Sequence, residues 1–296
     1  MNTKINLAGV ELKNPVMTAS GTFGSGMEYS EFVDLNKLGA VVTKGVANVP
    51  WPGNPTPRIA ETYGGMINAI GLQNPGIDVF CERDIPFLKK YDTKIIVNVC
   101  GKSERDYVEV VERLAGEPVD MLEINISCPN VKEGGIAFGQ NAANIEHITK
   151  AIKNVAKQPV IMKLSPNVTD ITEMAKAAEA GGADVLSLIN TITGMKIDIN
   201  RQTFAVANKT GGLSGPAVKP VAVRMVYQVA NAVKIPIIGM GGIATAEDAL
   251  EFILAGATAV SIGTANFHNP RTTLEVIEGI EKYMVNKGVS DINDLI

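Results

Sequence analysis

The sequence contains few of the residues from which several common kinds of active site are built. It has only two histidines, His147 and His268, and three widely separated cysteines, Cys81, Cys100 and Cys128. Two histidines, with His147 expected on a helix surface, argue against a histidine-based catalytic triad or a histidine metal site. Three cysteines without a CxxC pair indicate neither a disulfide framework nor a cysteine metal centre, and we expect a reducing cytoplasm.

Long apolar runs and blocks of like charge are also missing. No apolar run reaches the ~20 residues that a membrane-spanning helix needs. The N-terminal stretch MNTKINLAGVELKN lacks the hydrophobic segment of a signal peptide. The net charge is −4, from 27 basic and 31 acidic residues that are mixed along the chain. We therefore expect a cytoplasmic protein that binds neither nucleic acid nor a membrane.

The sequence does contain a regular alternation of short β-branched runs and longer helical patterns. The eight runs cover residues 15–20, 40–45, 94–99, 120–126, 160–165, 184–190, 235–242 and 258–264. Helix N-cap spacing opens three of the stretches between them, at Ser103 with Asp106, Asp170 with Glu173 and Thr245 with Asp248. The pattern predicts an α/β fold, a (β/α)8 TIM barrel in one domain over residues 1–296, with long βα-loop insertions over the C-terminal face.

A doubly wound open sheet is the competing α/β arrangement. It normally has fewer strands at this length and an early G-x-G-x-x-G fingerprint after the first strand. The segment GMGGIA (239–244) comes near the end of the chain and lacks that spacing. The barrel is therefore the better prediction.

Polar side chains stand at the ends of six predicted strands. They are Ser20, Lys44, Asn98, Asn125, Lys163 and Asn190. The C-terminal ends of barrel strands carry the active site, and alternation along a strand places Glu123 and Asn125 on one face. Burying lysines and asparagines together is costly unless a polar ligand fills the space, so this rim is a predicted binding site. Two long interruptions, residues 46–93 and 191–234, are expected over the same face.

Three glycine-rich segments predict a phosphate site at this rim. GMGGI (239–243) and SIGTA (261–265) follow the last two strands, and GGLSGP lies at 211–216. Without a Cβ, backbone N–H groups can approach an anion closely, although such glycines also serve simply to turn tight corners. The asparagines offer donors and acceptors together, which suits a planar ring with alternating C=O and N–H groups.

Lys163 and Cys128 are the candidate catalytic side chains. Lys163 could form a Schiff base, hold an anionic oxygen as a permanent cation, or pair with Glu123 inside the barrel. Lys44 is a candidate ligand for a substrate carboxylate. Cys128, in NISCPN just past a strand, could act as a thiolate nucleophile or general base, or be a small loop hydrophobe like the other two cysteines. The segment VKEGGIAFG (131–139) has the glycine hinges of a lid over it.

Several motifs together resemble one family from end to end of the chain. They are NISCPN, NAIGLQNPG, KLSPN, GGLSGPAVKP, GMGGI and SIGTANF. The chain resembles class 1 dihydroorotate dehydrogenases, and GNPTPRIAE and NVKEGGIAFG are most similar to the catalytic subunit of the NAD-dependent class 1B branch. The resemblance implies FMN-dependent oxidation of dihydroorotate to orotate in de novo pyrimidine biosynthesis. It also implies a partner subunit with FAD and a [2Fe–2S] cluster, in a heterotetramer of two plus two, that passes electrons to NAD.

The resemblance assigns roles to individual residues. It places the catalytic base at Cys128, which removes a proton from C5 while hydride leaves C6 for the flavin, and it places Lys163 beside the flavin. The implied FMN contacts are Ser20, Lys44, Gly45, Asn98, Asn125, Lys163, Ile189, Gly215, Gly241, Gly242, Gly263 and Thr264. The implied substrate contacts are Lys44, Asn68, Ala69, Ile70, Gly71, Leu72, Asn125, Asn190 and Thr191. A metal is not implied.

Three other functions remain open at this point. A fumarate-dependent class 1A enzyme would share the site but not the partner. A Schiff-base aldolase would use Lys163 and would be colourless, and a non-enzymatic barrel that binds a phosphate ligand would leave any flavin spectrum unchanged by substrate. The membrane-bound, quinone-using class is excluded by the cysteine at position 128, where that class has serine.

Overall fold

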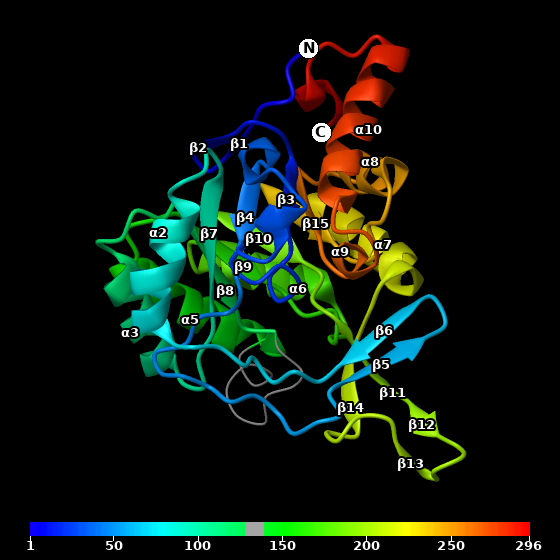
Figure 1. Ribbon diagram of the computed structural model, residues 1–296. Coiled ribbons are helices and arrows are strands. Elements are labelled where there is room, and N and C mark those ends of the chain that lie inside the picture. The colour runs from blue at the N-terminus through cyan, green and yellow to red at the C-terminus, as the bar shows by residue number, and fades with distance from the viewer. Residues whose placement is uncertain (128–138) are drawn as a thin grey trace.

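Eight parallel strands close into a barrel in the computed structural model, which describes residues 1–127 and 139–296 (Figure 1). The strands are β3 (Val16–Thr18), β4 (Ala40–Val42), β7 (Lys94–Val99), β8 (Met121–Asn125), β9 (Val160–Lys163), β10 (Val185–Leu188), β15 (Ile237–Met240) and β16 (Ala259–Ile262). They neighbour one another in chain order, and β10 closes onto both β9 and β15. Each lies within one of the eight predicted runs, so the predicted (β/α)8 barrel is confirmed.

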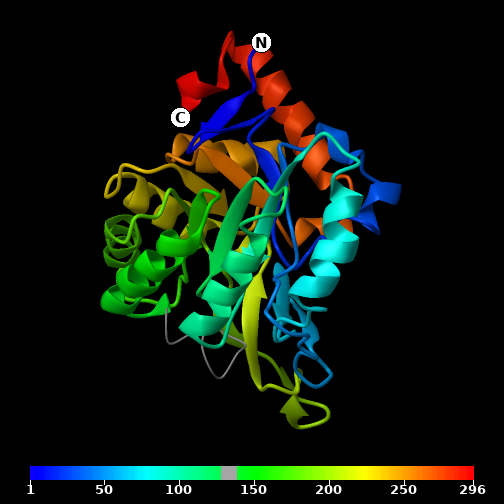
Figure 2. The same cartoon turned by 90° about the vertical axis from the view of Figure 1, so that its left-hand side faces the viewer.

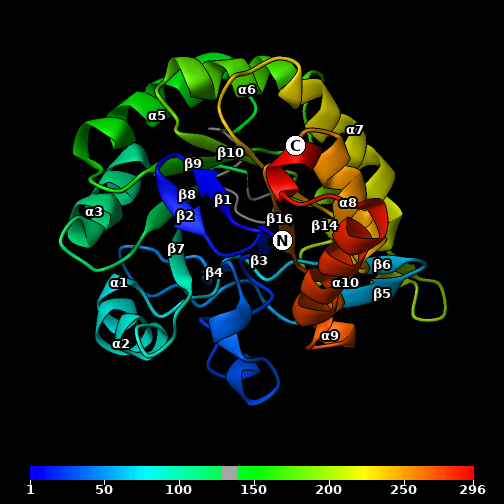
Figure 3. The same ribbon diagram turned by 90° about the horizontal axis from the view of Figure 1, so that it is seen from above.

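Helices form a ring around the barrel, as Figure 3 shows from above. The longer ones are α3 (Glu104–Leu114), α5 (Ala142–Val155), α6 (Ile171–Ala180), α7 (Lys219–Ala230), α8 (Ala246–Leu254) and α10 (Thr272–Lys287). Ser103 and Thr245 begin α3 and α8 with complete capping boxes, while the Asp170 side chain caps α6 through the backbone N–H of Thr172. The barrel strands are buried along almost their whole length because helices cover one face and the barrel interior the other.

The two long insertions are not loops alone but form one antiparallel sheet. It contains β5 (Ile59–Thr62), β6 (Gly65–Asn68), β11 (Ile192–Met195) and β14 (Thr210–Ser214), in the order β11-β14-β6-β5. The first insertion also holds a short helical segment with α1 (Ile77–Val79), a π-helical turn (Phe80–Asp84) and α2 (Ile85–Leu88). The second adds a small hairpin of β12 (Ile197–Asp198) and β13 (Thr203–Phe204). The pair β14–β6 therefore joins the two insertions.

The two ends of the barrel are covered differently. Figures 1 and 2 show the insertion sheet at one end and both chain termini at the other. The N-terminal hairpin, β1 (Ile5–Leu7) with β2 (Val10–Leu12), places Ile5, Leu7 and Leu12 in the main hydrophobic core. Over residues 1–127 and 139–296, no helix has the length and apolar character to cross a membrane. The C-terminal ends of the strands are thus left to form a site beneath the insertion sheet.

Candidate active site

A cavity of about 990 Å³ lies at the C-terminal ends of the barrel strands and reaches the insertion sheet. It brings together almost all of the predicted binding residues. Those that line it are Ser20, Lys44, Gly45, Asn68, Ile70, Gly71, Leu72, Asn98, Asn125, Lys163, Ile189, Asn190, Thr191, Gly215, Gly241, Gly242, Gly263 and Thr264. Residues from all eight barrel strands or the loops after them, and from both insertions, therefore meet in one hollow.

Ala69 is the predicted binding residue that does not line this cavity. It is fully buried in a small cluster with Ile67 and Val206. Its backbone N–H donates to the carbonyl of Arg58 at 2.7 Å, and its own carbonyl accepts from Asn54 Nδ2 at 3.0 Å. Both backbone groups that a ligand could use are thus occupied within the insertion.

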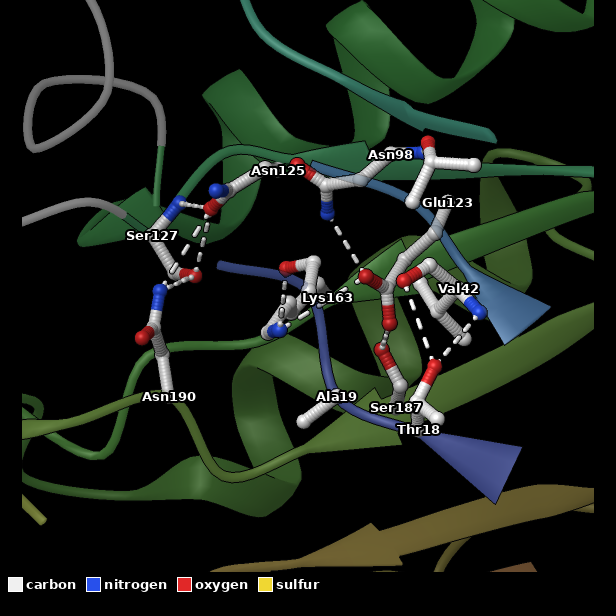
Figure 4. A network of polar contacts seen from close by, with 12 residues as sticks. Thr18, Ala19, Val42, Asn98, Glu123, Asn125, Ser127, Lys163, Ser187 and Asn190 are labelled. Carbon is white, nitrogen blue, oxygen red and sulfur yellow. Dashed lines mark hydrogen bonds and ion pairs between the residues drawn. The ribbon is translucent and has the colours of Figure 1, made fainter. Parts of the chain in front are cut away.

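Cys128 and the predicted lid lie in or next to the part of the chain outside the described residues. Residues 128–138 belong to that part, and Gly139 is the first described residue after it. Ser127, immediately before Cys128, is buried and closely held. Its Oγ donates to Asn125 Oδ1 at 3.1 Å and accepts from Asn190 Nδ2 at 2.7 Å (Figure 4).

Lys163 and Asn98 meet at a buried carboxylate below the cavity. Glu123 Oε2 accepts from Asn98 Nδ2 at 2.6 Å and lies 3.5 Å from Lys163 Nζ, while Oε1 accepts from Ser187 Oγ at 2.8 Å. Lys163 Nζ also donates to Ser20 Oγ at 3.3 Å. From the sequence, Lys163 could be either a binding-site side chain or the partner of Glu123 in an interior ion pair. In the structure it lines the cavity and also forms that ion pair.

The glycine turns after the last strands lie against one another. Gly215, Gly241 and Gly242 have φ values of +102°, +124° and +85°, a backbone region that residues with a Cβ rarely adopt. A Cβ on Gly242 would lie 2.8 Å from the Gly215 carbonyl oxygen. Next to them, Thr264 Oγ1 donates to Ser214 Oγ at 2.8 Å. These turns place backbone and hydroxyl groups close together at one end of the cavity.

The helices behind these turns are fixed by a charged cluster. Lys219, at the start of α7, lies 2.7 Å from Asp248 and 2.6 Å from Glu251 of α8. Its pKa is raised by the hydrogen bonds to these two carboxylates. Burial raises the pKa of Asp248, but the hydrogen bonds from Lys219 and from the N–H groups of Ala244 and Thr245 outweigh burial, so the pKa lies below its usual range.

Two observations fit a flat, phosphate-bearing group such as FMN. Asn98 Oδ1 is buried and has no hydrogen-bond partner among the described residues, yet Asn98 lines the cavity. Ser261 Oγ, on β16, also lines the cavity and has no partner within the described part of the chain. Unpaired acceptors and hydroxyls of this kind are costly unless a ligand or water satisfies them, and the glycine turns leave room for a phosphate.

Sequence reasoning missed some polar groups of this site. Ser187, Ser214 and Ser261 were not predicted to take part. Ser187 and Ser261 each interrupt an apolar strand, in DVLSLIN and TAVSIGT, and that interruption was the available signal. Ser214 lies in the insertion, where a strand was not predicted.

The chain matches the family model described as dihydroorotate dehydrogenase over residues 2–284. The chain belongs to the dihydroorotate dehydrogenase family. Over 296 residues it is 77% identical to a Lachnoclostridium phytofermentans protein named dihydroorotate dehydrogenase B (NAD(+)), catalytic subunit, covering 100% of this chain and 99% of that protein. Over 295 residues it is 66% identical to an Alkaliphilus oremlandii protein of the same name, covering 100% and 98%. The predicted resemblance to the NAD-dependent branch is confirmed by these relatives.

A solved structure within the dihydroorotate dehydrogenase family supports the fold. The structure of DHODH in complex with ferulenol from Eimeria tenella superposes with a TM-score of 0.83, covering 100% of this chain and 88% of that one. The sequences are 24% identical, so this likeness shows the fold alone.

Proposed function

We propose that this chain binds FMN and oxidises dihydroorotate to orotate in de novo pyrimidine biosynthesis. The proposal is supported by family membership and by the names of the relatives. The observation that carries it is that one cavity combines two lysines, several asparagine amides and three glycine turns. Cations suit a carboxylate and a phosphate, and the amides suit a pyrimidine and a flavin ring.

The proposed FMN site uses the groups that the fold leaves exposed to the cavity. Gly241, Gly242, Gly263 and Thr264 would hold the phosphate end through backbone and hydroxyl groups. Asn98 would present its unpaired Oδ1 to a ring N–H. The remaining proposed contacts are Ser20, Lys44, Gly45, Asn125, Lys163, Ile189 and Gly215. When bound, FMN supplies the acceptor for the hydride that leaves C6 of dihydroorotate.

The proposed substrate site uses the other cavity residues. Lys44 would bind the substrate carboxylate, and the amides of Asn68, Asn125 and Asn190, with Thr191, would hydrogen-bond the pyrimidine ring. The backbone of Ile70, Gly71 and Leu72 lies beside them on the cavity wall. A ring held by several fixed amides has one orientation, which fixes where the proton at C5 lies.

Cys128 is proposed as the base that removes this proton. As a thiolate it takes the proton from C5, and loss of that proton together with hydride from C6 leaves the C5=C6 double bond of orotate. The thiol then releases the proton to solvent. The two hydrogen bonds of Ser127 support this role, because they anchor the residue that immediately precedes Cys128.

The word "subunit" in the names of the relatives supports a separate partner. We propose that this partner carries FAD and a [2Fe–2S] cluster, that two copies of each chain form a heterotetramer, and that NAD is the final acceptor. The fumarate-dependent alternative is less well supported, because the relatives are named for NAD(+). A cytoplasmic location stays a prediction.

An anaerobic visible spectrum of the purified chain, before and after dihydroorotate is added, tests the proposal. We expect a flavin band that dihydroorotate bleaches. Cys128→Ala is expected to keep the band and to lose bleaching rate by about 10²- to 10⁴-fold, the usual contribution of a general base. A band that does not respond would remove dihydroorotate as the substrate.

A Schiff-base aldolase on Lys163 is disfavoured by one observation. Lys163 is 4% exposed, and its amine lies 3.5 Å from Glu123 Oε2 and 3.3 Å from Ser20 Oγ, an arrangement that suits a permanent cation. A colourless protein in which borohydride traps a carbonyl compound on Lys163 would reverse this choice. A flavin-containing protein whose spectrum is insensitive to every ligand would instead favour the non-enzymatic barrel.

A further inference from the structure

Glu123 is a buried carboxylate for which the proposed reaction has no direct use. It is 1% exposed and does not line the cavity. Within the described part of the chain, its three side-chain partners come from three other strands, Asn98 from β7, Lys163 from β9 and Ser187 from β10. Figure 4 shows these side chains converging on the carboxylate from around the barrel wall.

The burial of the Glu123 carboxylate is energetically costly and must be compensated by its partners. Removing a carboxylate from water is strongly unfavourable unless it is paired and hydrogen-bonded, and apolar residues can often replace a buried ion pair without loss of stability. Both oxygens of Glu123 are in fact used, one by Ser187 and the other by Asn98 and Lys163. The partners that line the cavity are Asn98 and Lys163, so the effect of Glu123 reaches the cavity through them.

The carboxylate determines which way the Asn98 amide faces. A carboxylate only accepts hydrogen bonds, so the Nδ2 group of Asn98 must point to Glu123. Oδ1 then points the other way, and a Cβ on Gly45 would lie only 3.0 Å from it. This leaves Oδ1 without a partner among the described residues, next to the cavity. A neutral amide in place of Glu123 could accept or donate, and would not select one orientation.

The same carboxylate fixes the end of the Lys163 side chain. Lysine has a long, flexible stem, and ordering it costs rotamer entropy. In this chain its amine lies between Glu123 Oε2 at 3.5 Å and Ser20 Oγ at 3.3 Å, and the residue is 4% exposed. Glu123 therefore supplies a fixed counter-charge directly below the cavity.

We propose that Glu123 is a positioning residue that sets the Lys163 amine and the Asn98 amide for the cofactor ring. The inference rests on the proposed function, because both side chains are there assigned to FMN. Glu123 itself does not line the cavity, so it acts through these two neighbours. The placement of the Lys163 amine and the Asn98 amide depends on where the carboxylate lies as well as on its charge.

The test is a double-mutant cycle on FMN binding by the apoprotein. Glu123→Gln keeps the side-chain volume and removes the charge, and we expect it to weaken FMN binding about tenfold when Lys163 and Asn98 are intact. In a Lys163→Met, Asn98→Ala background, the same change is expected to alter the dissociation constant less than about twofold, because contacting groups show non-additive effects. Quenching of FMN fluorescence on binding measures each constant without requiring turnover.

Ser214→Ala is the matched control for this cycle. Ser214 also lines the cavity, but its hydroxyl accepts from Thr264 and not from the Glu123 cluster. Its effect on FMN binding should therefore add to that of Glu123→Gln. The proposal is wrong if Glu123→Gln weakens FMN binding as much in the Lys163→Met, Asn98→Ala protein as in the wild type. Glu123 would then act through general stability.

Two further variants keep the test informative. Glu123→Asp retains the charge but shortens the side chain, so we expect a loss of FMN affinity between those of wild type and Glu123→Gln; wild-type affinity would overturn the positional requirement. Ser187→Ala leaves Glu123, Lys163 and Asn98 in place and should change affinity less than about threefold, about half of what a tenfold change requires in free energy. A larger loss in Ser187→Ala would mean that the whole buried network, and not the two cavity contacts, determines FMN binding.

Bleaching of the wild-type flavin band by dihydroorotate is measured in the same experiments. Failure of the proposed function and failure of this inference are therefore distinguishable.

Discussion

Asn190 Nδ2 donates a hydrogen bond to Ser127 Oγ at 2.7 Å, between residues 63 positions apart in the sequence. Ser127 follows β8 and Asn190 follows β10, and the same hydroxyl donates to Asn125. One serine thus joins two of the amides proposed to hold the pyrimidine ring, directly before Cys128. This hydroxyl therefore fixes the amides of Asn125 and Asn190 relative to each other.

Ser127→Ala is therefore expected to raise the KM for dihydroorotate about fivefold, the equivalent of one neutral hydrogen bond of roughly 1 kcal/mol. Asn190 Nδ2 would lose its hydrogen bond of 2.7 Å to Ser127 and keep the longer one of 3.4 Å to Asn125 Oδ1, so its amide would be held less firmly. FMN affinity should change less than this KM, because only one of the two amides that Ser127 bonds, that of Asn125, is also assigned to the flavin. Steady-state kinetics and an FMN titration measure the two quantities.

Thr149→Ala provides the control for Ser127→Ala. Thr149 is fully buried in α5, and its hydroxyl bonds to the Ile145 carbonyl of the same helix. Losing that hydroxyl should lower stability while leaving KM unchanged. If KM rose equally in both variants, loss of a buried hydroxyl anywhere would explain the result, and Asn190 positioning would not.

Gly242→Ala tests the glycine turns. Both Gly242 and Gly9 have a positive φ, +85° and +90°, so alanine at either position is expected to cost about 1–2 kcal/mol in free energy of unfolding. Only at Gly242 does a Cβ also meet neighbours, with the Gly215 carbonyl oxygen and Lys219 Cβ both 2.8 Å away. At Gly9 nothing lies within 4 Å.

We therefore expect Gly242→Ala to weaken FMN binding at least about tenfold and Gly9→Ala to leave it unchanged. Denaturant unfolding and FMN titration of both variants provide the comparison. Normal FMN binding by a folded Gly242→Ala protein would argue against a phosphate at this turn.

The cysteines are expected to differ in reactivity. Burial, reinforced by Glu117, raises the pKa of Cys81 to about 11. At pH 8 only about one Cys81 thiol in a thousand is then ionised, and the thiolate is the reactive form. Iodoacetamide at pH 8 should modify Cys128 first, orotate should slow that reaction, and Cys81 should react only as the pH approaches 11. Peptide mass mapping follows each site, and equal rates at pH 8 would contradict the assignment of Cys128.

Asp248→Asn tests the charged cluster behind the glycine turns. The pKa of Asp248 is lowered in the folded protein, so its carboxylate stabilises the fold at pH values above its unfolded pKa of about 4, and this contribution is lost as the pH falls through the lower folded value. At pH 7 the variant should lose about 1–2 kcal/mol, the contribution of a hydrogen bond to a charged group. The difference from wild type should shrink in urea unfolding below about pH 4.

Glu251→Gln serves as the comparison for Asp248→Asn. It removes the other partner of Lys219, but the Glu251 side chain is 51% exposed whereas that of Asp248 is 17% exposed. A loss below about 0.5 kcal/mol is expected, as for exposed ion pairs. If the two variants were equally destabilised at every pH, the ionisation of Asp248 would not be the cause.

The barrel and most of the cavity could be predicted because they depend on local signals. Each barrel strand lies in a run that could be recognised from its own residues. The site of such a barrel lies at the C-terminal ends of its strands, so the position of a residue in its run predicts whether it is near the site. This is why Lys44, Asn98, Lys163 and Asn190 were found from strand ends alone. The glycine turns were likewise predicted from glycine-rich segments next to the last strands, and the motif resemblance added most of the residues of the insertions.

The insertion sheet could not be predicted, because its pairing is long-range. β6 and β14 pair across more than 140 residues, with Asn68 opposite Gly212, and no local alternation in GMIN or TGGLS indicates a strand. The same limit explains Ala69, which lies between cavity residues in sequence but packs away from the cavity with Ile67 and Val206. The orientation of the Asn98 amide also depends on a neighbour from another strand.

The joining of the two insertions through β14 and β6 restricts how the gene can vary in length. Adding or removing one residue within either strand shifts the pairing by one position and turns its side chains to the opposite face, so Asn68 would leave the cavity. The turn at residues 199–202, between β12 and β13, has no such partner in this sheet. Insertions and deletions in a working enzyme should therefore collect at that turn and be absent from the two paired strands.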